Sequence, residues 1–291
     1  MRDNLRFDHG CRRTWLILPL AALMLAAGCR DHRPSAVGRV PTSAAAAAKA
    51  PGYLKPEERP DAIALLPPPP APGSREADAD ATKYRELKPL EGTARWALAH
   101  ADSNLKFPEA PNAFACALGI RIDPKTTPRL YTLLHRSIID AGQSTYPAKL
   151  KYNRTRPFVD TGDPTCVPED EEVLHGNGSY PSGHASLGYV WAEVLAEVAP
   201  DRAAALRERG YQFGKSRAVC RVHYQSDVDA GRAVGAAVMP ILRANAEYRA
   251  DVEAAKIEAR KARVLGPDPG SACDAEAAAL RPTATQPGVT P

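Results

Sequence analysis

The stretch that decides the fold is GSYPSGHASLGYVWAEVL, residues 178–195, which opens with turn-forming residues and then becomes an apolar helical pattern. From His184 onward, apolar and small side chains recur at the i, i+3, i+4, i+7 spacing of a helix. Pro200 ends the run. We therefore expect a helix that begins beside Ser182 and His184.

His184 lies in the first turn of this expected helix, and two interpretations are open. In the first, Ser182 or Ser179 caps the helix and His184 is a solvated side chain. In the second, the free N–H groups of the first turn form an anion site that Ser182 and Gly183 approach closely. His184 is then placed to move a proton.

The surrounding chain, from about residue 82 to residue 265, has helical periodicity and little strand alternation. Helices are expected over residues 95–104, around 130–141, from Asp201 to about 213, and within 226–248. The last of these carries small residues suited to close helix contact, namely Gly231, Gly235 and Ala236. The pattern predicts an all-α helical bundle in one domain, large enough for a real core.

The first 28 residues have the pattern of a signal peptide, with arginines, an apolar run from Trp15 to Ala27 and a small-residue junction. The run is too short to span a bilayer comfortably, and export is expected. The junction Leu-Ala-Ala-Gly-Cys, residues 25–29, resembles a bacterial lipobox, which would make Cys29 a lipidated first residue. Arg30 stands where an aspartate would retain such a protein at the inner membrane. An ordinary signal peptide cut near the same place is the alternative.

Two segments flank the helical region. Residues 29–81 are rich in proline, alanine and small residues, which predicts a partly extended tether. Deleting residues 30–79 is therefore expected to leave activity nearly intact. Residues 266–291 repeat this composition and predict a flexible tail, although Cys273 can pin part of it. The expected folded domain is residues 82–265.

The cysteines and the charge limit the partners. Cys116, Cys166, Cys220 and Cys273 lie beyond the junction and can form up to two disulfides in an oxidising periplasm, with three pairings open. Their spacing does not fit a zinc knuckle. The net charge of +4 is modest and is not concentrated in a basic run with aromatics, so nucleic acid is not an expected partner.

Two further segments carry chemistry. In KLKYNRTRP, residues 149–157, Pro157 disfavours helix at Arg156, which leaves this arginine free to turn inward with Lys149. A solvated basic helix face is the simpler interpretation of these charges. In SRAVCRVHYQSD, residues 216–227, His223 precedes Asp227 by four positions, which is either a helix-surface pair or a carboxylate that orients a nucleophilic imidazole.

In chain order, the sequence carries K-x6-R-P, P-S-G-H and S-R-x5-H-x3-D. Together these resemble the three-part signature of the type 2 phosphatidic acid phosphatase (PAP2) superfamily, which includes vanadium haloperoxidases and glucose-6-phosphatase. The flanking sequences NGSYPSGHASLGY and RGYQFGKSRAVCRVHYQSDVDAGR are similar to those of the bacterial class A non-specific acid phosphatases. The resemblance spans about residues 107–261 and does not include the expected tether or tail.

The resemblance implies a phosphate site that needs no metal or other cofactor. Lys149, Arg156 and Arg217 would balance the charge of the transferred phosphoryl group, while Ser182 and the Gly183 amide donate hydrogen bonds to it.

It also implies the catalytic roles. His223 would attack phosphorus to form a phosphohistidine, and Asp227 would orient it. His184 would protonate the leaving alkoxide and then activate water.

The expected function is that of an exported acid phosphatase acting on small phosphate monoesters in the periplasm. The only expected contact with a membrane is through a lipid at Cys29, which would place the protein at the outer membrane. A homo-oligomer is left open. The alternatives are a vanadate-dependent haloperoxidase, a lipid or pyrophosphate phosphatase of the same superfamily, and a binding protein on a decayed scaffold. His100, His135 and His175 are expected to be surface or capped side chains, and Arg154 and Arg221 to be solvated or at the rim of the site.

Overall fold

The computed structural model describes residues 51–266, 268–270 and 272–281. Every regular element in these ranges is a helix, so the predicted all-α class is confirmed. The expectations for residues 1–50, which are the signal peptide, the lipidated Cys29 and the first part of the tether, lie outside the described residues.

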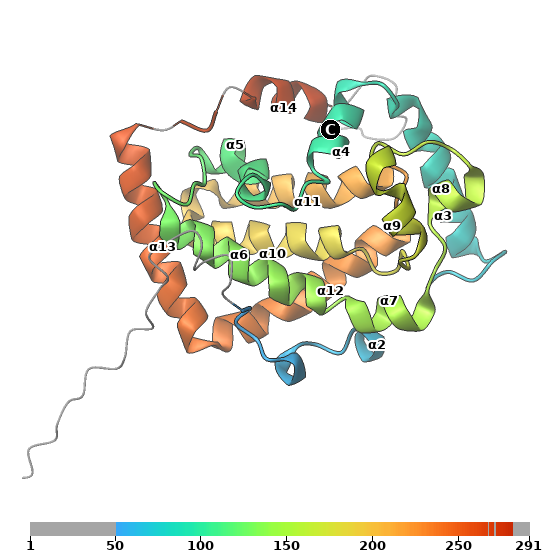
Figure 1. Ribbon diagram of the computed structural model, residues 1–291, viewed down its shortest axis with the longest axis horizontal. Helices are drawn as coiled ribbons and strands as arrows, with labels where there is room; N and C mark the ends of the chain where they lie inside the picture. Colours follow the sequence, from blue (N-terminus) through green and yellow to red (C-terminus); the bar gives the residue numbers. More distant parts are fainter. Residues whose placement is uncertain (1–50, 267, 271, 282–291) are drawn as a thin grey trace, which may run out of the picture. The chain divides into compact units, whose positions relative to one another are not determined.

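The centre of the described unit is the helix that follows the PSGH motif. This helix, α10 (Gly183–Val198), packs against α6 (Pro128–Gln143), α11 (Ala203–Val219), α12 (Gln225–Ala244) and α13 (Ala246–Leu265) (Figure 1). It buries apolar side chains around its whole circumference, which is what a helix enclosed by others requires. Its N-terminus is thereby held in a fixed place among its neighbours.

Glycines allow α12 to approach α10 at backbone distance. A Cβ added to Gly231 would lie 2.1 Å from the Ser182 carbonyl oxygen, and one added to Gly235 would lie 2.6 Å from that of Ser186. No side chain fits in such a gap. The close helix contact predicted for Gly231 and Gly235 is confirmed.

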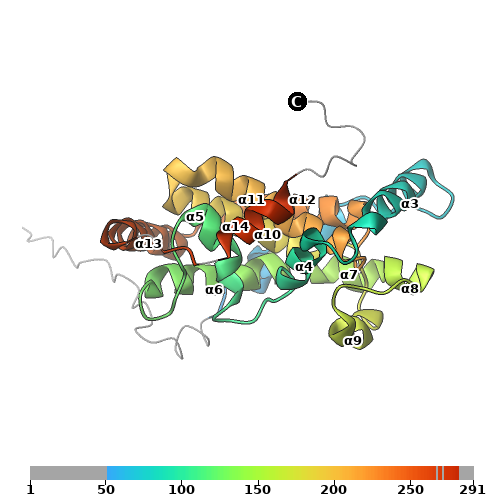
Figure 2. The same cartoon turned by 90° about the horizontal axis from the view of Figure 1, so that it is seen from above.

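Shorter helices surround these five. They are α2 (Ala62–Leu65), α3 (Arg75–Leu87), α4 (Ala94–Ala101), α5 (Ala115–Leu118), α7 (Tyr146–Tyr152), α8 (Pro157–Thr161), α9 (Glu171–His175) and α14 (Cys273–Leu280), with 3-10 turns at Pro56–Glu58, Lys88–Leu90, Ala110–Phe114, Pro168–Asp170 and Pro200–Arg202. Both views place α3, α8 and α9 at the end of the unit opposite α13 (Figures 1 and 2).

The prediction that the tether extends to residue 81 is wrong for residues 51–81. Tyr53 is buried, its hydroxyl donates to Asp251 Oδ2 at 2.7 Å, and its backbone N–H donates to Asp140 Oδ2 at 2.7 Å. Further along, Ala62 and Leu66 are buried and α3 is a regular helix. A proline-rich extended segment makes no internal hydrogen bonds. Its backbone N–H groups are therefore free to donate to side chains of the folded helices. Composition alone therefore does not reveal that this segment packs against the folded helices.

The predicted flexible tail is likewise wrong for its described part. Residues 273–280 form α14, whose Cys273 is bonded to Cys116 and whose Glu276 accepts a hydrogen bond from Arg209 Nε at 3.1 Å. The disulfide and this buried ion pair hold a short helix that could not persist alone.

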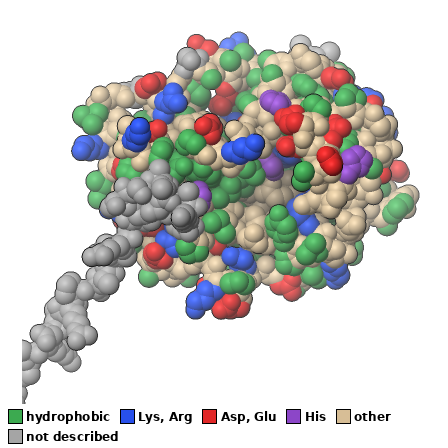
Figure 3. Space-filling view, in the orientation of Figure 1, with side chains coloured by type: hydrophobic (Ala, Val, Ile, Leu, Met, Phe, Trp, Pro, Cys, Tyr) green, Lys and Arg blue, Asp and Glu red, His purple; other side chains and the backbone are tan. Residues whose placement is uncertain are grey.

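Two disulfides join Cys116 to Cys273 and Cys166 to Cys220, which settles the pairing that the sequence left open. Such bonds indicate an oxidising compartment. No helix in the described ranges is long and apolar enough to cross a membrane. Figure 3 shows acidic and basic side chains interspersed over the described part of this face, in keeping with the modest net charge.

Candidate active site

The residues of the three motifs come together where α7, α8, α11 and the start of α10 meet. Lys149 lies on α7, Arg156 directly precedes α8, Arg217 lies in the last turn of α11, and His223 lies in the turn that leads to α12. All four side chains are buried. The solvated-face interpretation of the basic residues is therefore wrong.

Arg156 turns inward because the helix breaks before it. α7 ends at Tyr152 and α8 begins at Pro157, which leaves Arg156 in extended conformation, as its position before proline predicts. Its Nε donates to the Leu174 and Asn177 carbonyls at 3.0 and 2.9 Å, and its Nη1 donates to the Val222 carbonyl at 2.8 Å. This guanidinium is thus fixed to the backbone of α9, of the loop after it and of the turn before α12.

Lys149 is a buried cation that no carboxylate of residues 51–266, 268–270 or 272–281 contacts. Its Nζ donates to the Gly178 carbonyl at 2.8 Å. Burial, followed by the positive charge of Arg156, lowers the pKa of Lys149 to about 7. A cation destabilised in this way is stabilised by an arriving anion.

Arg217 supplies the strongest sign of an anion site. Its side chain is buried, and its Nε and Nη1 donors have no hydrogen-bond partner among the described residues. Burial and the nearby Arg156 lower the pKa of Arg217 to about 9. Buried donors that lack partners are rare because each loses its water without compensation. An oxyanion between Arg217, Arg156 and Lys149 would supply the missing acceptors.

The N-terminus of α10 borders this site. Ser182 is the N-cap and its Oγ accepts from the Ala185 N–H at 3.3 Å, so the capping interpretation holds for this serine. The Ser182 N–H donates to the Asp227 carbonyl at 2.8 Å, which ties the cap to the start of α12. Gly183 is the first helical residue.

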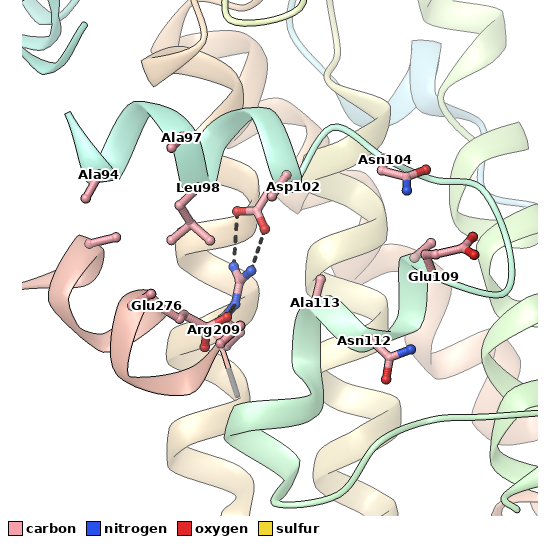
Figure 4. Close-up of a pocket in the computed structure, with 15 residues that line it drawn as sticks. Ala94, Ala97, Leu98, Asp102, Asn104, Glu109, Asn112, Ala113, Arg209 and Glu276 are labelled. Carbon is pink, nitrogen blue, oxygen red and sulfur yellow. Dashed lines mark hydrogen bonds and ion pairs between the residues drawn. The ribbon is translucent and has the colours of Figure 1, made fainter. Parts of the chain in front are cut away.

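His184 is half-buried, so the interpretation as a solvated side chain is wrong. Its Nε2 lies 3.0 Å from the Ser103 carbonyl, and its ring stacks on Phe213. Burial, followed by the charge of Arg217, lowers the pKa of His184 well below its usual value. Ser103 is itself anchored, because the preceding Asp102 is buried and paired with Arg209 (Figure 4).

His223 faces a carboxylate on one side and a cation on the other. Its Nδ1 lies 3.4 Å from Asp227 Oδ2, and its Nε2 lies 3.2 Å from Arg156 Nη1. Burial lowers the pKa of His223 well below its usual value, and the three nearby cations add to this effect. Both effects favour the neutral imidazole, whose Nε2 faces the Arg156 donor.

Two arginines differ from their expected place. Arg154 is paired with Asp227 and Asp80 at 2.6 and 2.9 Å, and Arg221 is buried and paired with Glu91 at 2.8 Å. Arg221 is therefore not solvated, and Arg154 is half-buried. Asp80 was missed by the sequence reasoning because it lies in the segment taken for a tether, and no spacing in the sequence links it to the motifs.

The remaining histidines are outside the site. His100 and His175 are exposed, as expected, whereas His135 is half-buried against the edge of Phe107. A cavity of about 270 Å³ borders Lys149 and is lined by Tyr146, Leu150, Asn153 and residues 176–178. A larger one of about 450 Å³ lies between α4 and α14 and has no motif residue in its lining (Figure 4).

The family model described as the PAP2 superfamily matches residues 130–250, which include all of these motif residues. A Zymomonas mobilis protein named acid phosphatase is 39% identical over 209 residues, which are 72% of this chain and 79% of that protein. A non-specific acid phosphatase of Providencia stuartii is 41% identical over 210 residues, 72% of this chain and 85% of that one. A non-specific acid phosphatase of Salmonella typhimurium is 42% identical over 185 residues, which are 63% of this chain and 74% of that one. The chain belongs to the PAP2 superfamily.

Proposed function

We propose that this acid phosphatase is exported and hydrolyses small phosphate monoesters through a phosphohistidine on His223, without a metal ion. The observation that carries the proposal is the pair of buried Arg217 donors, which have no acceptor in the described part of the chain and lie beside two further buried cations. The names of the relatives, which are acid phosphatases and non-specific acid phosphatases, support the substrate class.

The phosphate would be held by charge and by backbone donors. Lys149, Arg156 and Arg217 would surround its oxygens, with Ser182 and the Gly183 N–H at the positive end of the α10 dipole. Charge that spreads onto the equatorial oxygens in the transition state is stabilised by donors already in place. These side chains would thereby supply the positive charge that metal ions provide in other phosphatases.

His223 would form and later break the covalent bond. Because Arg156 Nη1 can only donate to Nε2, the imidazole proton would be on Nδ1, on the side of Asp227, and Nε2 would attack phosphorus while the bond to the leaving oxygen breaks. His184 gives its proton to that oxygen. In the second step His184 takes a proton from water, the water oxygen attacks phosphorus, and the N–P bond breaks to release inorganic phosphate.

The low pKa of His184 is compatible with this acid role. Arg217 is one cause of the low value, and a bound phosphate dianion would offset that positive charge. The pKa of His184 would therefore rise when substrate binds. Protonation of the catalytic acid is thus coupled to occupancy of the site.

Rapid-quench labelling separates the two histidines. His223→Ala should form no phosphoenzyme, whereas His184→Ala should accumulate it with p-nitrophenyl phosphate, whose leaving group needs little protonation, and form it slowly with an alkyl phosphate. His175→Ala, which changes an exposed histidine, is the matched control and should behave as the parent. Label on His223→Ala, or equal losses for both leaving groups in His184→Ala, would contradict the assigned roles.

The lack of a metal requirement and the reaction type are tested together. The parent protein should keep its hydrolytic rate in EDTA and should show no halide oxidation with vanadate and peroxide. Loss of hydrolysis in EDTA that a divalent ion restores would overturn the metal-independent mechanism. Halide oxidation would favour the haloperoxidase alternative.

Export is supported by the signal-like residues 1–28 and by the two disulfides, which favour an oxidising compartment such as the periplasm. We further propose lipidation at Cys29, which would anchor the enzyme to the outer membrane. Mass spectrometry of the mature N-terminus decides this point: an acylated Cys29 supports the anchor, and a free amine without acyl mass means an ordinary signal peptide.

A further inference from the structure

An aspartate of α3 lies against the start of α12, far from the motifs in sequence. Asp80 is buried, its Oδ1 accepts the Ser226 N–H at 2.9 Å, and its Oδ2 accepts from Arg154 Nη2 at 2.9 Å. The Ser226 hydroxyl also bonds to Oδ2. The carboxylate is therefore held by three donors, two of them from the first turn of α12.

Arg154 connects this carboxylate to a second one. While Nη2 is held by Asp80, Nη1 donates to Asp227 Oδ1 at 2.6 Å and to Ser226 Oγ at 2.8 Å. The guanidinium lies over the Tyr224 ring, 4.3 Å from its centroid. A planar guanidinium held at both terminal nitrogens has one orientation. Asp80, which binds Nη2, therefore determines the direction of Nη1.

The orientation of Asp227 depends on Arg154 in turn. Because Oδ1 is engaged by Arg154, Oδ2 is left to accept the Tyr224 N–H at 2.9 Å and to face His223 Nδ1 at 3.4 Å. Burial raises the pKa of the Asp227 carboxyl, and the charge of Arg154 opposes that rise. The contacts thus form a chain from Asp80 through Arg154 and Asp227 to His223.

We propose that Asp80 is a positioning residue for the reaction, which keeps Asp227 aligned on the nucleophilic histidine by acting as the counter-ion of Arg154. The inference rests on the proposed role of His223. Arg154 alone would neutralise Asp227, whereas the trio with Asp80 keeps a net negative charge beside His223. That charge stabilises the imidazole Nδ1–H as it becomes cationic during N–P bond formation.

The charged groups around His223 make the effect visible in a pH profile. Arg156, Lys149 and Arg217 add to burial in lowering the pKa of the imidazole, and a hydrogen bond to the Ser179 backbone raises it. Asp227 is the carboxylate beside it, with Oδ2 3.4 Å from Nδ1. Removing the negative charge of Asp80 leaves the cations less opposed. The acid limb of kcat/KM should therefore move to lower pH in Asp80→Asn.

The experiment compares Asp80→Asn with Asp78→Asn, which changes an exposed aspartate on the same helix. In Asp80→Asn the single-turnover rate of phosphoenzyme formation should fall by about 10–100-fold. Losses of this size are typical when a residue that orients a metal ligand through a hydrogen bond is replaced, and Asp80 acts on Asp227 in the same indirect way. KM for p-nitrophenyl phosphate should stay within about twofold, because Asp80 touches no proposed phosphate ligand. Asp78→Asn should match the parent in rate and in pH profile.

A double-mutant cycle tests the route. Asp80→Asn should lose most of its effect in an Arg154→Met background, since the link is already cut. An equal effect in both backgrounds, or a parental rate and pH profile in Asp80→Asn, would overturn the inference even if its Tm fell. If His223→Ala still formed phosphoenzyme, the proposed function itself would fail, whereas loss of label in His223→Ala with a parental rate in Asp80→Asn would remove only the role of Asp80.

Discussion

Replacing Gly231 by alanine should reduce activity sharply although Gly231 has no chemical role. Gly231 lies on α12 where that helix crosses the start of α10. An added Cβ would stand 2.1 Å from the Ser182 carbonyl oxygen and 3.0 Å from the Ala185 Cβ. The obstacle is backbone of the PSGH motif, which cannot rotate away as a flexible side chain can.

The size of the effect follows from that distance. Ordinary contact of a Cβ begins near 3.4 Å, so α12 and the Ser182 peptide must separate by about 1.3 Å. A misplacement of about 1 Å in a catalytic site can cost about 100-fold in rate. Overpacking of a filled interior costs about 1–3 kcal/mol of the free energy of unfolding. Gly231→Ala should therefore lose about 100-fold in kcat/KM and still fold.

Steady-state hydrolysis of p-nitrophenyl phosphate and urea unfolding measure the two effects. The control is Gly142→Ala on α6, where an added Cβ would meet no described atom within 4 Å outside its own helix backbone and chain neighbours. That variant should keep its activity and gain about 0.5–1 kcal/mol, as alanine does in place of glycine in a helix. A Gly231→Ala protein with kcat/KM within about twofold of the parent would refute the reasoning, since a shift near 1 Å should be costly.

Three further outcomes are expected. Because the pKa of Lys149 is about 7, competitive inhibition by sulfate should weaken about tenfold for each pH unit between 7 and 9, and Lys149→Met should lose this dependence. An inhibition constant that does not change with pH in the parent would contradict it. Removing the Cys116–Cys273 bond by two serine substitutions should lower stability by about 2–4 kcal/mol, measured by urea unfolding, while kcat is kept, and a large loss of kcat would show that α14 supports the site. Deleting residues 51–73 should lower Tm by about 5–10 °C, because Asp140 and Asp251 lose the donors of Tyr53, and an unchanged Tm would mean that this segment is a tether after all.

Two features of the candidate site could be expected from local signals in the sequence. Pro157 forces extended backbone at Arg156, and the small residues before the apolar run place Ser182 at a helix start. The class of the fold could likewise be predicted, because the apolar residues recur along the sequence with the 3.6-residue period of a helix.

What the sequence could not decide are the contacts between distant segments. Asp80 joins Arg154 across 74 residues and Tyr53 joins Asp251 across 198, and no periodicity links such pairs. The cysteine pairing also depended on which helices lie side by side. Composition indicated a tether at residues 51–81, because a segment with few apolar side chains cannot make a core of its own. Tertiary structure overrode this, since buried carboxylates on the folded helices need donors and the backbone and tyrosine of that segment provide them.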